Sequence, residues 1–284
     1  MGVLNVTPDS FSDGGKFLVP EKAIEHGLRM LDEGADILDV GGESTRPGAI
    51  VADELAQERA EHAQVSELEE LQRVLPVISG ILRARPDAVI SIDTYKAQVA
   101  RQAVAAGAEI VNDVSGFQWD VDMAKACAEM RCGVVLMHTR GKPREWRNLP
   151  KLSNITLEVE HDLGNRVRFA LECGVERARI ALDPGFGFGK ILDENYPLLA
   201  QLEALQRLGF PLLAGTSRKS FVGRTVARRT GRDVPPSERL YGSLAAMVVS
   251  ILHGAHIVRV HDVGPALEAA AVADAVLGAS ENSE

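Results

Sequence analysis

The 284-residue sequence lacks features that would tie it to a membrane or to nucleic acid. No apolar run reaches the roughly 18 residues that span a bilayer, and no basic segment followed by an apolar one opens the chain as a signal peptide would. Acidic residues number 40 and basic residues 31, and the net charge of -9 opposes general binding to nucleic acid. Cysteine is scarce: Cys127, Cys132 and Cys173 form no CxxC pair, which indicates reduced thiols in a cytoplasmic protein.

Common nucleotide, metal and nucleophile motifs are also absent. In the glycine-rich segment 183–190, Ile191 follows the lysine, and Pro184 stands where a Walker loop needs its first glycine. Gly185 and Gly187 have no glycine three residues further on, so the dinucleotide fingerprint fails as well. No His/Cys cluster has zinc spacing, and there is no Gly-x-Ser-x-Gly elbow. What remains is a loop whose three glycines let the backbone approach a ligand closely, with an acid at one end and a base at the other.

Eight short and nearly continuous apolar runs alternate with helical patterns, as is typical of strands buried on both faces. We expect strands over residues 2–6, 37–40, 89–92, 110–111, 133–137, 180–182, 211–214 and 257–260. We expect helices between these strands, for example over residues 21–33, 68–85, 96–106, 155–173, 195–208 and 242–253. This alternation predicts an α/β fold in one domain over residues 1–284, a (β/α)8 TIM barrel. A doubly wound sheet would have fewer strands and a glycine fingerprint.

Two of the predicted βα loops are long, namely residues 7–20 and 41–66. Both leave the carboxyl ends of strands, where barrels carry their chemistry, so we expect lids or binding loops. The acid-rich segment 52–70 is expected to be a solvated helix, with an acidic partner-binding patch as the alternative. We expect a frayed tail over residues 279–284. Because the chain begins almost directly on a strand, we also expect a few residues upstream of Met1.

Polar residues stand at or just after every predicted strand. They are Asn5, the segment 42–48, Asp93, Asn112 and Asp113, His138, Asp183, the segment 217–220, and Arg259, His261 and Asp262. Singly, each has a structural alternative: Asp93 as a helix cap, Asn112 as a turn residue, His138 as a loop histidine bonded to backbone, Arg259 in an ion pair. A barrel collects all eight strand ends around one mouth, so we expect these residues to form one site.

The acceptors among them suit a flat heterocycle. Asp93, Asn112 and Asp183 offer oxygens and one amide, and Lys219 offers a donor, which fits a ring rich in N–H and carbonyl groups. Two carboxylates can also stabilise a cationic ring.

The bases suit an anion. Arg259 can stack on a ring or hold an anion, and it alternates with His261 on one strand, so both face the same side. With Asn5 they predict a diphosphate site, where a single neutral oxygen ligand suits Mg²⁺ that keeps most of its waters.

Nine segments, in order from Met1 to about Val263, resemble those of dihydropteroate synthases: MGVLNVTPDSFSDGG, DVGGESTRPGA, SIDTYK, VNDVSG, VLMHTRGKP, LDPGFGFGK, GTSRKSF, SERLYGSLA and RVHDV. The resemblance implies a pterinylmethyl transferase that joins (7,8-dihydropterin-6-yl)methyl diphosphate to 4-aminobenzoate. The products would be diphosphate and 7,8-dihydropteroate, a folate precursor, and sulfonamide drugs would compete with 4-aminobenzoate. It also implies a homodimer formed through the C-terminal helical segments, including residues 242–253.

The resemblance further implies a role for each matching residue. The pterin pocket would be Asp93, Asn112, Met137, Asp183, Phe188, Gly215, Lys219 and Arg259. The diphosphate would bind to Asn5, Thr45, Arg259 and His261, with Asn5 also the Mg²⁺ ligand. The 4-aminobenzoate slot would be Phe11, Thr45, Arg46, Pro47, Phe188 and Ser220. Direct catalytic roles would fall to Asp93, Lys219, Phe11, Asp13 and Arg46.

The mechanism that the resemblance implies is dissociative. Diphosphate leaves first, Asp93 helps to hold the pterin methylene cation, and the arylamine attacks while closed loops exclude water. One departure is that residues 52–64 lengthen the link after Gly48, beyond the motif, so we expect no effect on the chemistry.

Two rival functions remain. One is a barrel that passes a methyl group from a folate to a corrinoid protein, and the other is a non-catalytic pterin-binding paralogue. The first would share the acids and the asparagine but would need neither the TPDSF and STRPG loops nor the lysine of SRKS.

Overall fold

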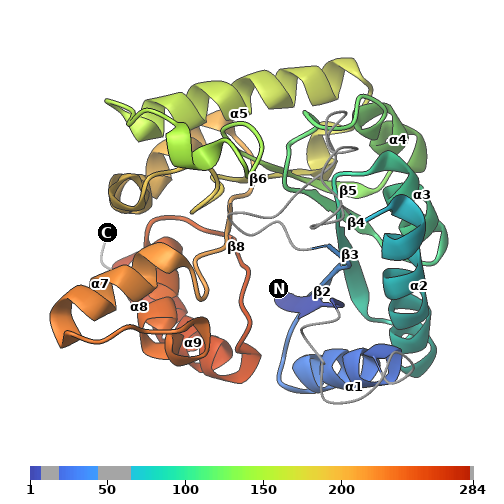
Figure 1. Cartoon of the computed structure of the whole chain (residues 1–284), viewed down its shortest axis with the longest axis horizontal. Coiled ribbons are helices and arrows are strands. Elements are labelled where there is room, and N and C mark those ends of the chain that lie inside the picture. The colour runs from blue at the N-terminus through green and yellow to red at the C-terminus, as the bar shows by residue number, and fades with distance from the viewer. Residues whose placement is uncertain (8–18, 44–64, 282–284) are drawn as a thin grey trace.

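In the computed structural model, which describes residues 1–7, 19–43 and 65–281, parallel strands alternate with helices (Figure 1). The strands are β1 (Gly2–Asn5), β2 (Ile37–Gly41), β3 (Val89–Asp93), β4 (Ile110–Asp113), β5 (Gly133–Met137), β6 (Ile180–Asp183), β7 (Leu213–Ala214) and β8 (Ile257–Val258). Strands β1 to β6 pair in chain order, and β7 pairs with β8. Every pairing is parallel, as expected when a helix connects each strand to the next.

Backbone contacts at two places join these two sheets into a ring. Leu182 of β6 forms a parallel bridge with Leu212, and its N–H donates to the carbonyl of Pro211 at 2.9 Å. Gly2 of β1 forms a parallel bridge with Val260, which follows β8. The eight strands therefore close on themselves, and the predicted (β/α)8 barrel is confirmed.

Helices pack around the outside of the ring, as Figure 1 shows. They are α1 (Val19–Asp32), α2 (Glu67–Ala84), α3 (Ala97–Ala105), α4 (Met123–Met130), α5 (Ile155–Glu172), α6 (Asn195–Ala200), α7 (Ser220–Thr230), α8 (Leu240–Leu252) and α9 (Val263–Glu281). The predicted helix over residues 195–208 is split, because a 3₁₀ helix, Leu202–Leu208, follows α6 and ends at Gly209 in the left-handed region. Helices α4, α7 and α9 lie outside the six segments given as examples, in places where the alternation of strands and helices leaves room for a helix.

Several sequence expectations fall at the edges of the described residues. The frayed tail is wrong for residues 279–281, because they continue α9 to Glu281. Of the acid-rich segment, α2 begins at Glu67, where Ser66 accepts a hydrogen bond from the N–H of Glu69, and residues 52–64 lie outside the described part. Residues 8–18 and 44–64, the bulk of the two long loops, also lie outside it. No helix in the described part is long and apolar enough to cross a membrane.

Side chains of the strands alternate between the inside of the ring and its outer face. Outward residues such as Leu38, Ile90 and Leu182 belong to the main hydrophobic core under the helices. Inside, a lower layer is apolar and consists of Met1, Val135 and Leu213 with Ile37, Ile110, Ala181 and Ile257. Two residues further along the same strands stand Asp39, Asn112, Asp183 and Arg259. The inside of the barrel thus changes from apolar to charged toward the carboxyl ends.

Candidate active site

A cavity of about 250 Å³ lies at the carboxyl ends of the strands. Eight of the predicted site residues line it: Asn5, Asp93, Phe188, Gly215, Lys219, Ser220, Arg259 and His261. Three more, Asn112, Met137 and Asp183, lie in or at the ends of β4, β5 and β6. Met137 packs against Phe188, Asp183 lies beside Gly215, and Asn112 is connected to Arg259 through Asp39. The remaining five, Phe11, Asp13, Thr45, Arg46 and Pro47, lie outside the described residues. The barrel therefore brings together all the predicted site residues that lie in the described part of the chain.

Arg259 is the centre of a buried ionic network in this cavity. Its Nε donates to Oδ2 of Asp39 at 2.6 Å, and its Nη2 donates to Oδ2 of Asp93 at 2.7 Å. The same oxygen of Asp39 accepts a hydrogen bond from Nδ2 of Asn112 at 2.9 Å. The guanidinium of Arg259, which follows β8, thus joins β2 and β3 directly, and Asp39 extends the network to Asn112 of β4. The network fixes the positions of Asp93 and Asn112 relative to each other.

Burial sets the protonation of this network. It raises the pKa of Asp93 from 3.8 to about 7, and the nearby Arg259 only partly opposes the shift. Burial by itself lowers the pKa of Arg259, but Asp39 and Asp93 more than offset it, so the pKa lies above its ordinary value. The guanidinium therefore stays charged while Asp93 titrates near neutral pH.

A second group of side chains forms the opposite wall. The Nζ of Lys219 lies 4.0 Å from the centroid of the Phe188 ring, a cation–π contact. Phe188 in turn meets Trp146 edge to face, with ring centroids 5.4 Å apart, and packs against the cluster that contains Met137. Oδ1 of Asp183 accepts from the N–H of Gly185 at 2.7 Å. Phe188 and Lys219 of this wall line the cavity, and Asp183 lies behind them, bonded to the loop backbone.

Asp183 and Gly215 meet at the floor of the site. A Cβ atom placed at Gly215 would lie 4.0 Å from Oδ2 of Asp183 and 3.9 Å from Cβ of Arg259. Burial raises the pKa of Asp183, while the Gly185 N–H and Lys219 lower it. The missing side chain at Gly215 leaves room for a flat group between the acid and the arginine.

His261 and Asn5 mark the basic end of the cavity. Nδ1 of His261 lies 3.0 Å from Oγ of Ser217, and burial, followed by the charge of Arg259, lowers the pKa of His261 to about 3. The imidazole is therefore neutral at physiological pH. Ser220 begins α7, whose N-terminal N–H groups favour an anion. An anionic group would here meet a guanidinium, a hydrogen-bonding imidazole and a helix end.

The structure bears on the structural alternatives for three of these residues. Asp93 is not a helix cap, because α3 begins at Ala97 and its N–H donates to Asp120 at 2.7 Å. His138 is fully buried, and its two ring nitrogens contact the side chains of Asp162 and Lys190 where the alternative expected backbone. The ion-pair alternative for Arg259 is correct, but both of its partners belong to the same network.

Two glycines of the 183–190 loop serve the fold, whereas the sequence suggested an approach to a ligand. Gly185 and Gly189 both have φ of 67°. A side chain at Gly185 would collide with the carbonyl oxygen of His138, and a Cβ at Gly189 would lie 2.9 Å from the carbonyl oxygen of Arg140. The loop is therefore pressed against the backbone that follows β5.

Sequence reasoning missed Asp39, which is fully buried and bonds to both Arg259 and Asn112. The signal was present: an acid inside the apolar run of β2 needs a buried partner. It also gave no role to Glu43, which lines the cavity and is held by Lys96 at 2.6 Å. In the described part of the chain, no group of three or more His, Cys, Asp or Glu residues could hold a metal ion by itself.

Comparison with known proteins agrees with this geometry. The family model for the pterin binding enzymes matches residues 1–261. A dihydropteroate synthase of Escherichia coli (strain K12) is 44% identical over 282 residues, which are 99% of this chain and 93% of that protein. The dihydropteroate synthase of Xanthomonas albilineans, solved with 4-aminobenzoic acid, superposes with a TM-score of 0.84 at 42% identity and covers 98% of this chain and 92% of that one. A structure from the same organism in complex with 7,8-dihydropteroate gives a TM-score of 0.82 at 40% identity, with the same coverage.

A closed barrel with a charged cavity at its carboxyl end, matched by that family model over most of its length, belongs to the pterin binding enzymes. Within them, at 44% identity over nearly the whole chain, it belongs to the dihydropteroate synthases.

Proposed function

We propose that the chain joins (7,8-dihydropterin-6-yl)methyl diphosphate to 4-aminobenzoate and releases diphosphate and 7,8-dihydropteroate. The observation that carries this proposal is the division of charge within one cavity. The carboxylate of Asp93 lines the cavity and that of Asp183 lies beside Gly215, where an electron-poor ring would lie, and Arg259 and His261 line the cavity where an anion would leave. The similarity to dihydropteroate synthases supports the same reaction.

The pterin ring would lie between Arg259 and the wall of Phe188 and Lys219, with Met137 behind it. Asn112 and Asp183 would bond its edge. Oδ1 of Asn112 is buried and has no partner among the described residues, so an acceptor is left for a ring N–H group. Gly215 leaves the space that a planar ring requires.

The first chemical step breaks the bond between the pterin methylene carbon and the diphosphate oxygen. The electron pair goes to the oxygen, and the new negative charge is received by Arg259 and His261. Asp93 lines the cavity beside Arg259, so its carboxylate would face the cation that remains on the pterin. The amine nitrogen of 4-aminobenzoate then forms the C–N bond and gives up a proton, which restores neutrality.

The 4-aminobenzoate slot rests on fewer described residues. Phe188 and Ser220 line the cavity on the side of α7. We assign Phe11, Thr45, Arg46 and Pro47 to the same slot, and Asp13 to the closing of the site. These two loops would exclude water, which would otherwise capture the cation.

A divalent metal fits if the diphosphate supplies most of its ligands. Asn5 offers one neutral amide group in the cavity, and Mg²⁺ commonly takes one or two protein ligands, waters and substrate phosphates. We therefore assign Mg²⁺ to Asn5, where it would offset diphosphate charge when bound.

The activity test is diphosphate release from wild-type protein mixed with both substrates and Mg²⁺. We expect release only when both substrates are present, together with formation of 7,8-dihydropteroate. Pterin binding without any release would favour the non-catalytic paralogue, and methyl transfer from a folate to a corrinoid protein would favour the other rival. Either result would overturn the proposal.

We infer one domain over residues 1–284, a homodimer that buries part of α8 and α9, and a cytoplasmic enzyme. The exposed side chains of Leu252, Leu267 and Val276 on these helices support the homodimer. Sedimentation of the purified chain at micromolar concentration tests it, and a monomer there would contradict it.

A further inference from the structure

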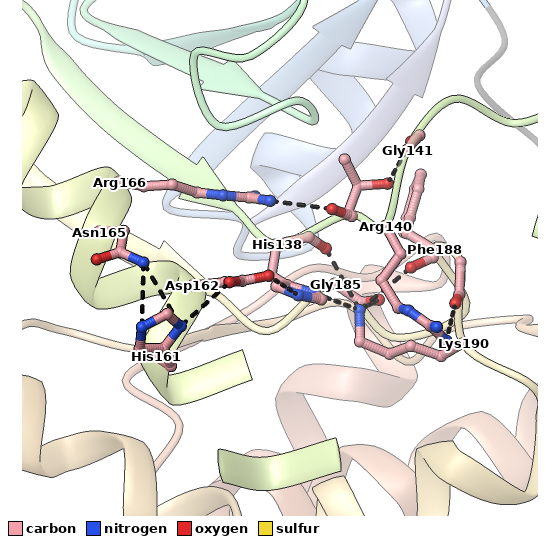
Figure 2. Close-up of polar contacts among 12 residues, drawn as sticks. His138, Arg140, Gly141, His161, Asp162, Asn165, Arg166, Gly185, Phe188 and Lys190 are labelled. Carbon is pink, nitrogen blue, oxygen red and sulfur yellow. Dashed lines mark hydrogen bonds and ion pairs between the residues drawn. The ribbon is translucent and has the colours of Figure 1, made fainter. Parts of the chain in front are cut away.

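A buried lysine lies behind the cavity and has no role in the proposed chemistry. Lys190 is 7% exposed. Its Nζ lies 2.8 Å from the carbonyl oxygen of Gly185, 2.9 Å from Nδ1 of His138, 3.2 Å from the carbonyl oxygen of Phe188 and 3.3 Å from that of His138 (Figure 2). One ammonium thus connects the loop after β6 to the residue that follows β5.

The contacts of His138 show where the positive charge of this group lies. Nε2 of His138 faces Oδ2 of Asp162 at 3.3 Å. Because that carboxylate accepts, Nε2 carries the proton and Nδ1 accepts from Lys190. Burial lowers the pKa of His138 to about 3 and also lowers the pKa of Lys190, which Asp183 opposes. Protonating the imidazole would place a second cation against Lys190, so the imidazole is neutral and its Nδ1 is an acceptor for the lysine.

The backbone around Lys190 needs such a cation. The left-handed conformations of Gly185 and Gly189 bring the loop tightly against residues 138–140. This arrangement turns the carbonyl oxygens of Gly185, Phe188 and His138 toward one buried point. Three converging carbonyl dipoles without a donor would repel one another and lose their hydrogen bonds. The ammonium brings three N–H donors to four acceptors, these carbonyl oxygens and Nδ1 of His138, so one donor is shared between two of them.

The loop held in this way carries cavity groups. Phe188, whose carbonyl bonds to Lys190, presents its ring to Lys219 at 4.0 Å. Gly185, whose carbonyl also bonds to Lys190, donates its N–H to Asp183 at 2.7 Å. The positions of a carboxylate, an aromatic ring and an ammonium at the pterin wall therefore depend on one loop conformation.

We propose that Lys190 is a positioning residue that acts as a fixed internal cation for the carbonyls of Gly185, Phe188 and His138 and so sets the pterin-facing wall of the cavity. This inference rests on the proposed function, because it assigns the wall to the pterin. It predicts that loss of the ammonium weakens pterin binding selectively and leaves the recognition of 4-aminobenzoate intact.

The experiment compares Lys190→Met, which removes the donors and the charge, with Lys190→Gln, which keeps two N–H donors without the charge. Binding of 6-hydroxymethyl-7,8-dihydropterin is measured directly by titration, and KM is measured for 4-aminobenzoate. We expect the pterin Kd to rise about tenfold or more in Lys190→Met and less in Lys190→Gln, with KM for 4-aminobenzoate within twofold of wild type. If Lys190→Met does not fold, Lys190→Gln carries the test.

Arg177→Met is the matched control, because Arg177 also donates to a backbone carbonyl, that of Gly209 at 3.1 Å, but precedes β6 at the other end of the barrel. We expect it to leave both constants unchanged. An unchanged pterin Kd in both Lys190 variants, or equal changes for both substrates, would overturn the inference. Wild-type protein that binds no pterin would instead overturn the proposed function, so the two failures are distinguishable.

Discussion

At the scale of single residues, the site depends on charges that neutralise one another before any substrate arrives. Asp39 and Asp93 flank Arg259, so the arginine is held in place for an anion. The sequence could predict Asp93, Asn112, Asp183 and Arg259, because strand ends in a barrel face one mouth. The sequence indicates that Asp39 needs a buried partner, but it does not identify Arg259 as that partner, because a strand buried on both faces gives no sign of which face is inside.

Replacing Asp93 with asparagine removes the charge closest to the proposed cation. We expect kcat for diphosphate release to fall by about a hundredfold or more, since one electrostatic contact at a transition state contributes about 2.7–4 kcal/mol. Asp87→Asn, in an exposed position before β3, is the matched control and should keep the wild-type rate. Near-normal turnover of Asp93→Asn would remove the role assigned to this carboxylate.

Replacing Arg259 with alanine should mainly affect the substrate that carries diphosphate. The variant loses a guanidinium for the anion and leaves Asp39 buried without its cation. We expect Kd for the pterin diphosphate to rise by a larger factor than Kd for 6-hydroxymethyl-7,8-dihydropterin, because only the former carries the anion. Titration of both ligands measures this, and equal losses would contradict an anion site at Arg259.

At the scale of elements, the strands were predictable and several helices were not. Apolar runs of four or five residues identify the strands that become β2, β3 and β5. The range of helix α9 was not predicted, because its apolar residues are spread around the helix and give no clear helical period. The range of helix α4 was not predicted either, because its eight residues are too few to show a helical period. The glycine loop was recognised, but its closest contacts are with residues 138–140, a tertiary fact that spacing alone does not contain.

The connection between β2 and α2 depends on another buried lysine. Nζ of Lys96 donates to Glu43 and Glu70 at 2.6 Å each and to the carbonyl of Val65 at 2.8 Å. Lys96→Met would leave two buried carboxylates together, and we expect a loss of about 3–5 kcal/mol in the free energy of unfolding. Chemical denaturation with urea measures it.

Lys125→Met serves as the control for that loss, because Lys125 pairs with Glu129 at 3.9 Å on the surface, with 74% of its side chain exposed. An exposed ion pair contributes about 0–1 kcal/mol. If the two variants lost similar stability, the contacts of Lys96 would not stabilise the connection between β2 and α2.

At the scale of the whole molecule, the closed ring forces buried titratable groups from distant segments into one interior. Burial shifts the pKa values of acids and bases in opposite directions. It raises the pKa of Asp93 to about 7 and lowers the pKa of His138 to about 3. As pH rises from about 3.8 to 7, the folded state binds more protons at Asp93 than the unfolded state does, which lowers stability. His138 changes the stability in the opposite direction, so the dependence of the free energy of unfolding on pH is the sum of the two contributions.

A difference between variants isolates His138. Between pH 3 and 6.5 the unfolded chain protonates this imidazole while the folded protein, with Lys190 and Arg166 nearby, does not. Stability should therefore fall as pH falls through this window, by up to about 1.4 kcal/mol per pH unit for one proton. We expect His138→Gln to be less stable than wild type at pH 7 but to lose less stability on acidification to pH 5, as measured by urea denaturation at both values.

His161→Gln, which changes an imidazole with 73% of its side chain exposed, is the control and should follow wild type. If His138→Gln and wild type lost the same stability between pH 7 and pH 5, the buried neutral imidazole would not contribute to acid sensitivity, and the charge assigned to the Lys190 cluster would have to be revised.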